Sequence, residues 1–243
     1  MDATRYGIDG WPYVVGLTGG ALVAGAGALL TDGRPRSACG VIALAAGVPA
    51  ALGSRYVFGG KVRHRDRLLD LVPWRGDETV LDIGAGAGLM GVGAAHRVPR
   101  GRVRCVDLWI GKDLARSGPE RLLANAGHDG VADRVEVRTG DARSLDLPDG
   151  SMDVVLSVLC LHNVPDEPGR RAAAAEIARV LTPGGRVVVS DLAGTEQLAR
   201  WFGEDGLHVL EHRRAPHTFP PQRVVVARRP VDRSTLIAVA PRP

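Results

Sequence analysis

The stretch Thr79–Gly93, which reads TVLDIGAGAGLMGVG, constrains the fold of this chain more than any other. Its apolar residues Val80, Leu81 and Ile83 predict a short buried strand. The glycines that follow predict a sharp turn into a helix starting near Leu89, because glycine has no Cβ and readily takes a positive φ. A strand, a glycine-rich loop and a helix in this order can seat a nucleotide-like ligand against loop amides and the helix N-terminus.

Two patterns overlap in the glycine-rich loop, and they point to different ligands. Residues 86–91 satisfy G-x-G-x-x-G, the dinucleotide pattern, and Asp107 lies at a suitable distance along the chain to hold a ribose. Residues 82–88 also read D-x-G-x-G-x-G, which places the carboxylate of Asp82 just before the loop. A carboxylate there would repel a pyrophosphate, whereas it suits the ammonium and sulfonium groups of S-adenosylmethionine (SAM).

With this second pattern the sequence resembles the class I SAM-dependent methyltransferases, whose first motif it is. Three further matches follow along the chain: Gly140-Asp141-Ala142, the Asp153–Leu156 strand pattern, and the Leu181–Val187 turn with its Pro-Gly-Gly. The resemblance covers roughly residues 61–229 and is to the methyltransferase type 11 domains, similar to the quinone-biosynthesis methyltransferases. One departure is Ala85, where many members have cysteine.

The resemblance implies SAM as the cofactor and assigns its contacts. Asp107 would accept hydrogen bonds from two ribose hydroxyls, and Asp141 would accept one from the exocyclic amine of adenine. The amide of Ala142 would donate to a ring nitrogen of adenine. The complete set of expected cofactor contacts is Asp82, Gly84, Ala85, Gly86, Gly88, Asp107, Leu108, Asp141, Ala142 and Ser157.

His162 and Asn163 follow the fourth predicted strand, at the rim where the methyl group would be delivered. His162 is the candidate general base, because histidine titrates close to neutral pH. The alternative is a histidine that packs in the loop or caps it. Asn163 could orient an acceptor oxygen or simply close the turn.

Alternating strand and helix patterns predict an α/β fold, a Rossmann-like seven-stranded methyltransferase sheet with ligands over the carboxyl ends of its parallel strands. The segments Leu207–His212 and Val224–Ala227 are expected to pair as a terminal antiparallel hairpin. Ser117 and Glu120 have the spacing of a capping box at a helix start. Further strands are expected at 102–108, 135–138, 152–160 and 186–190, and a further helix at 166–181.

Two long uncharged segments precede this domain, 22 residues over Gly10–Thr31 and 18 residues over Ser37–Ser54. A helix needs about 20 apolar residues to cross a bilayer, so with the turn at Asp32–Arg36 they predict an α-helical transmembrane hairpin. Small residues recur every four positions and are expected to let the helices pack closely. They are Gly16, Gly20, Ala24 and Ala28 in the first segment and Ala43, Gly47 and Ala51 in the second. A buried helical pair inside a soluble cap is the alternative.

Basic residues predict that both flanks of the hairpin lie in the cytoplasm, because the turn holds two of them and the flanks hold six. We therefore expect a protein of the cell membrane with two spans and a cytoplasmic catalytic domain. The expected divisions are the hairpin at 1–57, a basic connecting helix at 58–75, the methyltransferase domain at 76–230 and a flexible tail at 231–243. The connecting helix would lie along the membrane surface or form the first helix of the α/β domain.

Composition narrows the range of partners. The net charge is +4, but the basic residues are dispersed and only 4% of residues are aromatic, so we expect no nucleic-acid partner. The three cysteines lie far apart, which indicates reduced thiols and no metal site. The expected partners are a small-molecule acceptor and a membrane, and the oligomeric state is left open.

These observations together predict an enzyme that moves a methyl group from SAM to an O, N or C atom of a small, apolar or lipid-like acceptor. Two alternatives are kept. One is an NAD-dependent oxidoreductase, suggested by the dinucleotide pattern, and the other is a non-catalytic scaffold with the methyltransferase fold held at a membrane. The carboxylate of Asp82 and the Pro-Gly-Gly turn favour the methyltransferase over the oxidoreductase.

Overall fold

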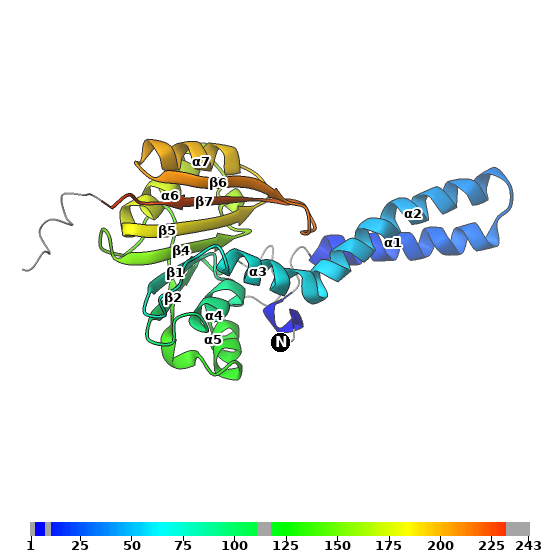
Figure 1. Ribbon diagram of the computed structural model, residues 1–243. Coiled ribbons are helices and arrows are strands. Elements are labelled where there is room, and N and C mark those ends of the chain that lie inside the picture. The colour runs from blue at the N-terminus through cyan, green and yellow to red at the C-terminus, as the bar shows by residue number, and fades with distance from the viewer. Residues whose placement is uncertain (1–2, 8–10, 111–117, 232–243) are drawn as a thin grey trace, which may run out of the picture.

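The computed structural model describes residues 3–7, 11–110 and 118–231, which form an α/β domain and a long helical hairpin that projects from it (Figure 1). The expected tail after Val231 and Ser117 of the capping box lie outside the described residues. The strands are β1 (Thr79–Ile83), β2 (Arg102–Asp107), β3 (Val135–Thr139), β4 (Met152–Val158), β5 (Leu181–Asp191), β6 (His208–Ala215) and β7 (Gln222–Arg228). The helices are α1 (Trp11–Leu30), α2 (Arg34–Arg55), α3 (Lys61–Leu69), α4 (Leu89–Ala95), α5 (Pro119–His128), α6 (Glu167–Val180) and α7 (Thr195–Glu204). Short helical turns are η1 (Ala3–Tyr6), η2 (Tyr56–Gly60), η3 (Ala132–Arg134) and η4 (Leu161–Asn163).

The strands form one seven-stranded sheet in the order β3-β2-β1-β4-β5-β7-β6. β1 to β5 pair in parallel, while β7 runs antiparallel to both β5 and β6. The predicted Rossmann-like sheet with a terminal antiparallel hairpin is therefore confirmed. The strand order reverses between β1 and β4, which is where open α/β sheets bind ligands at the carboxyl ends of their strands. We call this side of the sheet the carboxyl edge.

Helices cover both faces of the sheet and give it two cores (Figure 1). On one face, Val80, Val103 and Val188 pack with residues of α3, α4 and α5. On the other, Leu81 and Val187 pack with residues of α6 and α7. This alternation follows from the two-residue period of a strand, so neighbouring residues of β5 serve opposite cores.

The structure favours one of the two alternatives for the basic helix and moves the start of one strand. The basic helix α3 forms the first helix of the α/β domain, because Leu68 and Leu69 are buried in the core it shares with α4. β5 begins at Leu181, five residues earlier than expected. A register shift against β4 makes this extension possible, because Leu181 pairs with Met152 before regular pairing resumes at Arg186.

The two N-terminal helices α1 and α2 pack against each other as a hairpin (Figure 1). Small residues do make the contact, but not all the expected ones. A Cβ on Gly27 would come within 3.1 Å of the sulfur of Cys39, and one on Gly47 within 3.7 Å of Ala21. By contrast, Gly16 and Gly20 have open space around them. They therefore lie off the contact between the two helices.

Apolar side chains cover the outside of the hairpin. Val23 is 76% exposed and Leu44 is 68% exposed, so the part of the chain that the structure describes does not bury the hairpin. Helix α2 continues through η2 into α3, and this helix, Arg34–Leu69, is long and apolar enough to cross a membrane. The apolar part described in the first helix, Val15–Leu30, is shorter than a membrane span. One of the two expected spans is thus a candidate by length and composition.

Candidate functional site

The loop between β1 and α4 has the conformation that its glycines predict. Gly84, Gly86 and Gly88 all have positive φ, at 74°, 51° and 87°. A Cβ on Gly84 would lie 2.3 Å from the sulfur of Cys160, so no larger residue fits there. The loop therefore lies directly against the end of β4, at the carboxyl edge, where its backbone can approach a ligand.

Asp82 links β1 to the helix that follows this loop. Its Oδ2 accepts a hydrogen bond from the amide of Gly91 in α4 at 2.7 Å, and the side chain is buried. Burial raises the pKa of Asp82 to about 7, and the nearby charge of Asp107 adds to the effect. We expected Asp82 to attract the methionine part of SAM directly. In the structure its side chain bonds to α4, and a direct contact with SAM stays a prediction.

Asp107 ends β2 with its carboxylate between two loops. Its Oδ2 accepts from the amide of Gly86 at 2.8 Å, and its Oδ1 accepts from the amide of Trp109 at 2.7 Å. A carboxylate has about four acceptor positions, so these two bonds leave capacity for ribose hydroxyls. Leu108 is exposed beside it and could cover one face of an adenine. Trp109 takes a positive φ of 57°, a strained conformation at the rim of the site.

Asp141, Ala142 and Ser157 occupy three different environments. The Asp141 carboxylate is paired with Arg143, whose terminal nitrogen lies 2.6 Å from its Oδ2, and this lowers the pKa of Asp141. An adenine amine would therefore compete with Arg143 for this carboxylate. Ala142 is buried. The hydroxyl of Ser157 is also buried and has no hydrogen-bond partner within the described part of the chain.

His162 and Asp191 form a hydrogen-bonded pair at the ends of β4 and β5. Nδ1 of His162 lies 2.5 Å from Oδ1 of Asp191, and the backbone amide of His162 donates to Oδ2 at 3.2 Å. Asp191 is buried, whereas the His162 side chain remains partly exposed. An ionised Asp191 can only accept, so it assigns the proton to Nδ1 and leaves the lone pair of the ring on Nε2. This is the arrangement of a general base with an orienting carboxylate.

Asn163 lies in the short turn η4 and is exposed. Its backbone amide donates to the carbonyl of Cys160 at 3.0 Å, so the residue does close the turn. Its role toward an acceptor stays a prediction.

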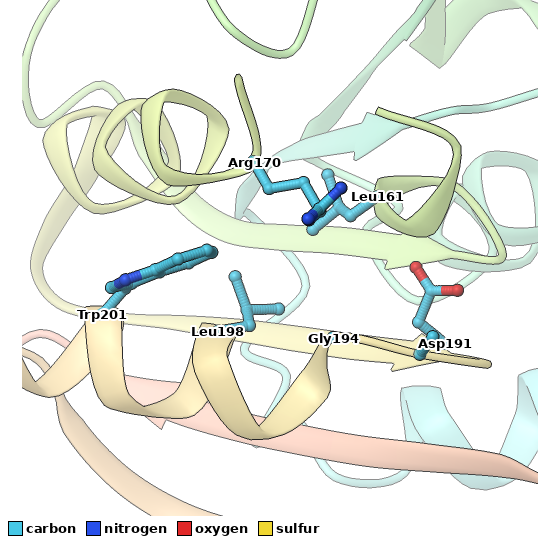
Figure 2. A pocket seen from close by; sticks show the side chains of 7 residues that line it. Leu161, Arg170, Asp191, Gly194, Leu198 and Trp201 are labelled. Carbon is cyan, nitrogen blue, oxygen red and sulfur yellow. The ribbon is translucent and has the colours of Figure 1, made fainter. Parts of the chain in front are cut away.

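Figure 2 shows a small pocket beside Asp191, between α6 and α7. Trp201 and Leu198 project from α7, and Arg170 reaches in from α6. The pocket is lined by Leu161, Arg170, Asp191, Ala193, Gly194, Leu198 and Trp201. Apolar walls around one side of Asp191 reduce its hydration and strengthen its pairing with His162.

The residues at the carboxyl edge fit SAM. The glycine loop allows close approach of a ligand, Asp107 keeps acceptor capacity at the strand end, and Leu108 offers an apolar surface beside it. The buried hydroxyl of Ser157 gives one further polar group at the end of β4. Among the residues that the structure describes, no three His, Cys, Asp or Glu side chains gather in a way that could hold a metal ion.

Sequence reasoning missed two features of this edge. Asp191 was not singled out, although it ends an apolar strand in the same way as Asp107 ends β2. The second is a buried polar chain on the opposite face, in which His64 contacts Ser190 and Ser190 contacts Gln222. Its members come from three distant segments, and no local pattern in the sequence connects them.

Comparison with known proteins agrees with the fold and the loop. Residues 80–185 match the family described as "Methyltransferase domain". The chain is 37% identical over 136 residues to nocamycin O-methyltransferase of Saccharothrix syringae, which covers 56% of this chain and 45% of that protein. It is 34% identical over 134 residues to demethylmenaquinone methyltransferase of Thermus thermophilus, covering 54% and 55%. Its fold is similar to that of a SAM-dependent methyltransferase from Aquifex aeolicus, with a TM-score of 0.57, 16% identity, and 74% and 97% of the two chains covered.

Residues 80–185 therefore form a methyltransferase domain of the class I, SAM-dependent type. The chain spans about half the length of the curated relatives it matches. The family match and the named relatives favour the methyltransferase over the NAD-dependent oxidoreductase.

Proposed function

We propose that this protein is a membrane-anchored methyltransferase that moves a methyl group from SAM to a small, apolar acceptor. The observation that carries the proposal is the pairing of His162 with the buried Asp191 at the carboxyl edge, beside the glycine loop. A general base is useful when the acceptor must lose a proton as it is methylated, so a hydroxyl or enol oxygen fits this site best. The two curated relatives are named for an O-methylation and for demethylmenaquinone, which is in keeping with an apolar acceptor.

The chemistry that SAM supplies is an electrophilic methyl group on a sulfonium. Loop 84–88 and Asp107 are the residues that would hold the donor beside the rim formed by η4. Nε2 of His162 would take the proton from the acceptor oxygen and hold it. Asp191 stabilises the imidazolium that results. The main contribution of the domain is alignment of donor and acceptor with water excluded.

The hairpin supports anchoring in the cell membrane. Its outside is apolar, and one helix has the length and composition of a span. At about 1.5 Å per residue, the 20 residues of α1 extend roughly 30 Å, close to the thickness of the hydrocarbon core. Both ends of the hairpin adjoin basic residues, and the positive-inside rule then keeps the catalytic domain in the cytoplasm.

The proposal is tested by methyl transfer to a natural membrane extract. Membranes from a strain that lacks the gene are incubated with purified full-length protein and methyl-labelled SAM, and the lipid extract is analysed for labelled products. We expect a discrete labelled product that the His162→Ala variant forms far more slowly. If the protein binds SAM yet labels nothing in lipid or aqueous extracts, it is the non-catalytic scaffold and not an enzyme.

A further inference from the structure

The hairpin is joined to the α/β domain at the carboxyl edge, and the first of two joints involves the N-terminal turn η1. The side-chain amide of Asn125 donates to the carbonyl of Arg5 at 3.1 Å and to the carbonyl of Ala87 in the glycine loop at 2.8 Å. Tyr6, which is buried, donates from its hydroxyl to Asp129 at 3.0 Å. The segment that leads into α1 is therefore held directly beside the cofactor loop.

The second joint is at the other end of the hairpin, where α2 passes into η2 and α3. The side-chain amide of Gln222 donates to the Tyr56 hydroxyl at 2.8 Å, and the hydroxyl of Ser190 donates to Gln222 at 2.7 Å. Nε2 of His64 lies 2.8 Å from the same Ser190 hydroxyl. All four residues are buried. Because β5 ends at Asp191 and β7 begins at Gln222, this joint also lies at the carboxyl edge.

The two joints fix the direction of the hairpin. One lies beside the glycine loop after β1 and the other beside the end of β5, so the hairpin base spans the side of the sheet that holds the candidate site (Figure 1). Buried polar groups that all have partners specify one geometry, because breaking any of these bonds leaves a buried group unsatisfied. Phe58, in η2 at this base, is 61% exposed. The exposed ring of Phe58 continues the apolar surface of the hairpin to its base.

Exposed basic side chains lie near the base of the hairpin, at the end of α2, on α3 and at the end of β6. We call Arg55, Arg63, Arg67, Arg213 and Arg214 the basic collar, and all five are exposed. Arg63 and Arg67 lie four residues apart on the outer face of α3. Arg67 and Arg213 also lie close enough to His217, in the loop between β6 and β7, to lower its pKa after the larger effect of burial. Two carboxylates are near: Asp66 pairs with Arg65, and Glu211 pairs with Arg213.

We propose that the carboxyl edge of the sheet faces the lipid bilayer, with the basic collar on anionic phospholipid headgroups. This rests on the proposed insertion of the hairpin into a membrane. The hairpin then extends into the hydrocarbon, the collar lies at the level of the headgroups, and the rim with His162 opens toward the membrane surface. The acceptor reaches His162 from the lipid side, which names a lipid-dissolved compound as the substrate class.

Photo-crosslinking in vesicles tests the orientation with the full-length protein. A benzophenone amino acid replaces Pro216, an exposed residue in the β6–β7 loop at the carboxyl edge. The matched control replaces Pro99, an exposed proline before β2 at the opposite edge. In vesicles of phosphatidylcholine with phosphatidylglycerol, we expect position 216 to crosslink to phospholipid and position 99 to crosslink at least about tenfold less.

The role of the collar is tested by removing two of its charges. Arg63→Gln with Arg67→Gln should reduce crosslinking at position 216 by about fivefold or more in the anionic vesicles, since each basic residue near a charged surface adds to the attraction. Arg100→Gln with Arg102→Gln removes the same charge from the opposite edge and should leave the yield unchanged. An equal loss in both double variants would overturn the collar as the headgroup site.

The outcomes separate the orientation from the anchoring. If the protein does not float with vesicles at all, the hairpin is not inserted, and the proposed membrane anchoring fails together with the orientation. If the protein floats but positions 216 and 99 crosslink equally, the anchoring stands and the orientation is wrong. Each variant is compared for SAM binding first, so that a misfolded protein is recognised.

Discussion

Ser190 and Asp191 are consecutive residues of β5 whose side chains leave the sheet on opposite faces. The hydroxyl oxygen of Ser190 lies 2.8 Å from Nε2 of His64, within hydrogen-bond distance, on the face where the hairpin is joined to the domain. The carboxylate of Asp191 meets Nδ1 of His162 at 2.5 Å, on the face of the candidate base. A single strand end thus holds both the joint and the orienting carboxylate. Because one peptide unit joins Ser190 to Asp191, a displacement of α3 would also shift the carboxylate that holds His162.

Loss of the base should reduce turnover without loss of the cofactor. We expect His162→Ala to lower kcat by roughly 10²–10⁴-fold with unchanged SAM affinity, the usual contribution of general base catalysis. Asp191→Asn should also lower kcat, because an asparagine amide can donate to Nδ1 and favour the wrong tautomer. Turnover assays and calorimetry with SAM measure the two effects. A change of less than about threefold in His162→Ala would make the histidine a structural residue.

Removal of the Asp107 carboxylate should weaken SAM binding in two ways. Asp107→Ala loses the acceptor for the ribose hydroxyls, each worth about 1.5–3 kcal/mol when the acceptor is charged. It also releases the amide of Gly86, which this carboxylate holds at 2.8 Å. Calorimetry on the folded variant measures the loss of affinity. Asp133→Ala, at an exposed position in η3, is the control that should bind SAM normally.

His64 should make the folded state less stable in mild acid. Burial, and then the neighbouring His217, lower the pKa of His64 from 6.5 to about 4. The unfolded chain therefore binds a proton between these values that the native state does not, and stability falls as the pH is lowered from about 6.5 to 4. Arg67 and Arg213 also face His64 and oppose its protonation.

Denaturant unfolding at pH 7 and pH 5 measures this dependence. The wild type should lose about 2 kcal/mol relative to His64→Gln over that interval, from the two pKa values and 1.36 kcal/mol per unit. Asp82 works in the opposite direction, because its pKa is raised to about 7, but its contribution is the same in both proteins and cancels. Parallel pH dependence of the two proteins would show that His64 is not the responsible group.

A charge in the middle of the hairpin should prevent membrane integration. Leu44→Arg places a guanidinium near the centre of α2, at a cost of about 2.5–3.5 kcal/mol if that helix crosses a bilayer. Leu30→Arg, at the tip of the hairpin, should be tolerated because its side chain can reach the interface. Both positions are exposed, so neither change disturbs packing within the protein. Extraction of membranes with alkaline carbonate should release only Leu44→Arg.

The local sequence pattern was sufficient to predict the sheet and the glycine loop. It was not sufficient to predict contacts between distant segments of the chain. The glycines at 84, 86 and 88 have a conformation that few other residues adopt, so their spacing carried the prediction of the loop. The hydrogen bond between Asp82 and the amide of Gly91 could not be predicted, because it depends on how α4 packs against β1. Tyr56 shows the same limit: it lies on the hairpin side of the expected boundary at residue 57, yet it is buried against Gln222. Which small residues of α1 meet α2 depends on the crossing of the helices, which spacing alone does not give.

The helix runs without a break from α2 through η2 into α3, so no flexible linker separates this end of the hairpin from the domain. With the hairpin inserted in a membrane, the domain stays at a fixed distance from the membrane surface and does not diffuse into the surrounding solution. The quantity that sets its rate is then the mole fraction of acceptor among the lipids, not the amount per volume of cell. Adding inert lipid at constant protein and acceptor would slow the reaction by surface dilution, and adding water would not.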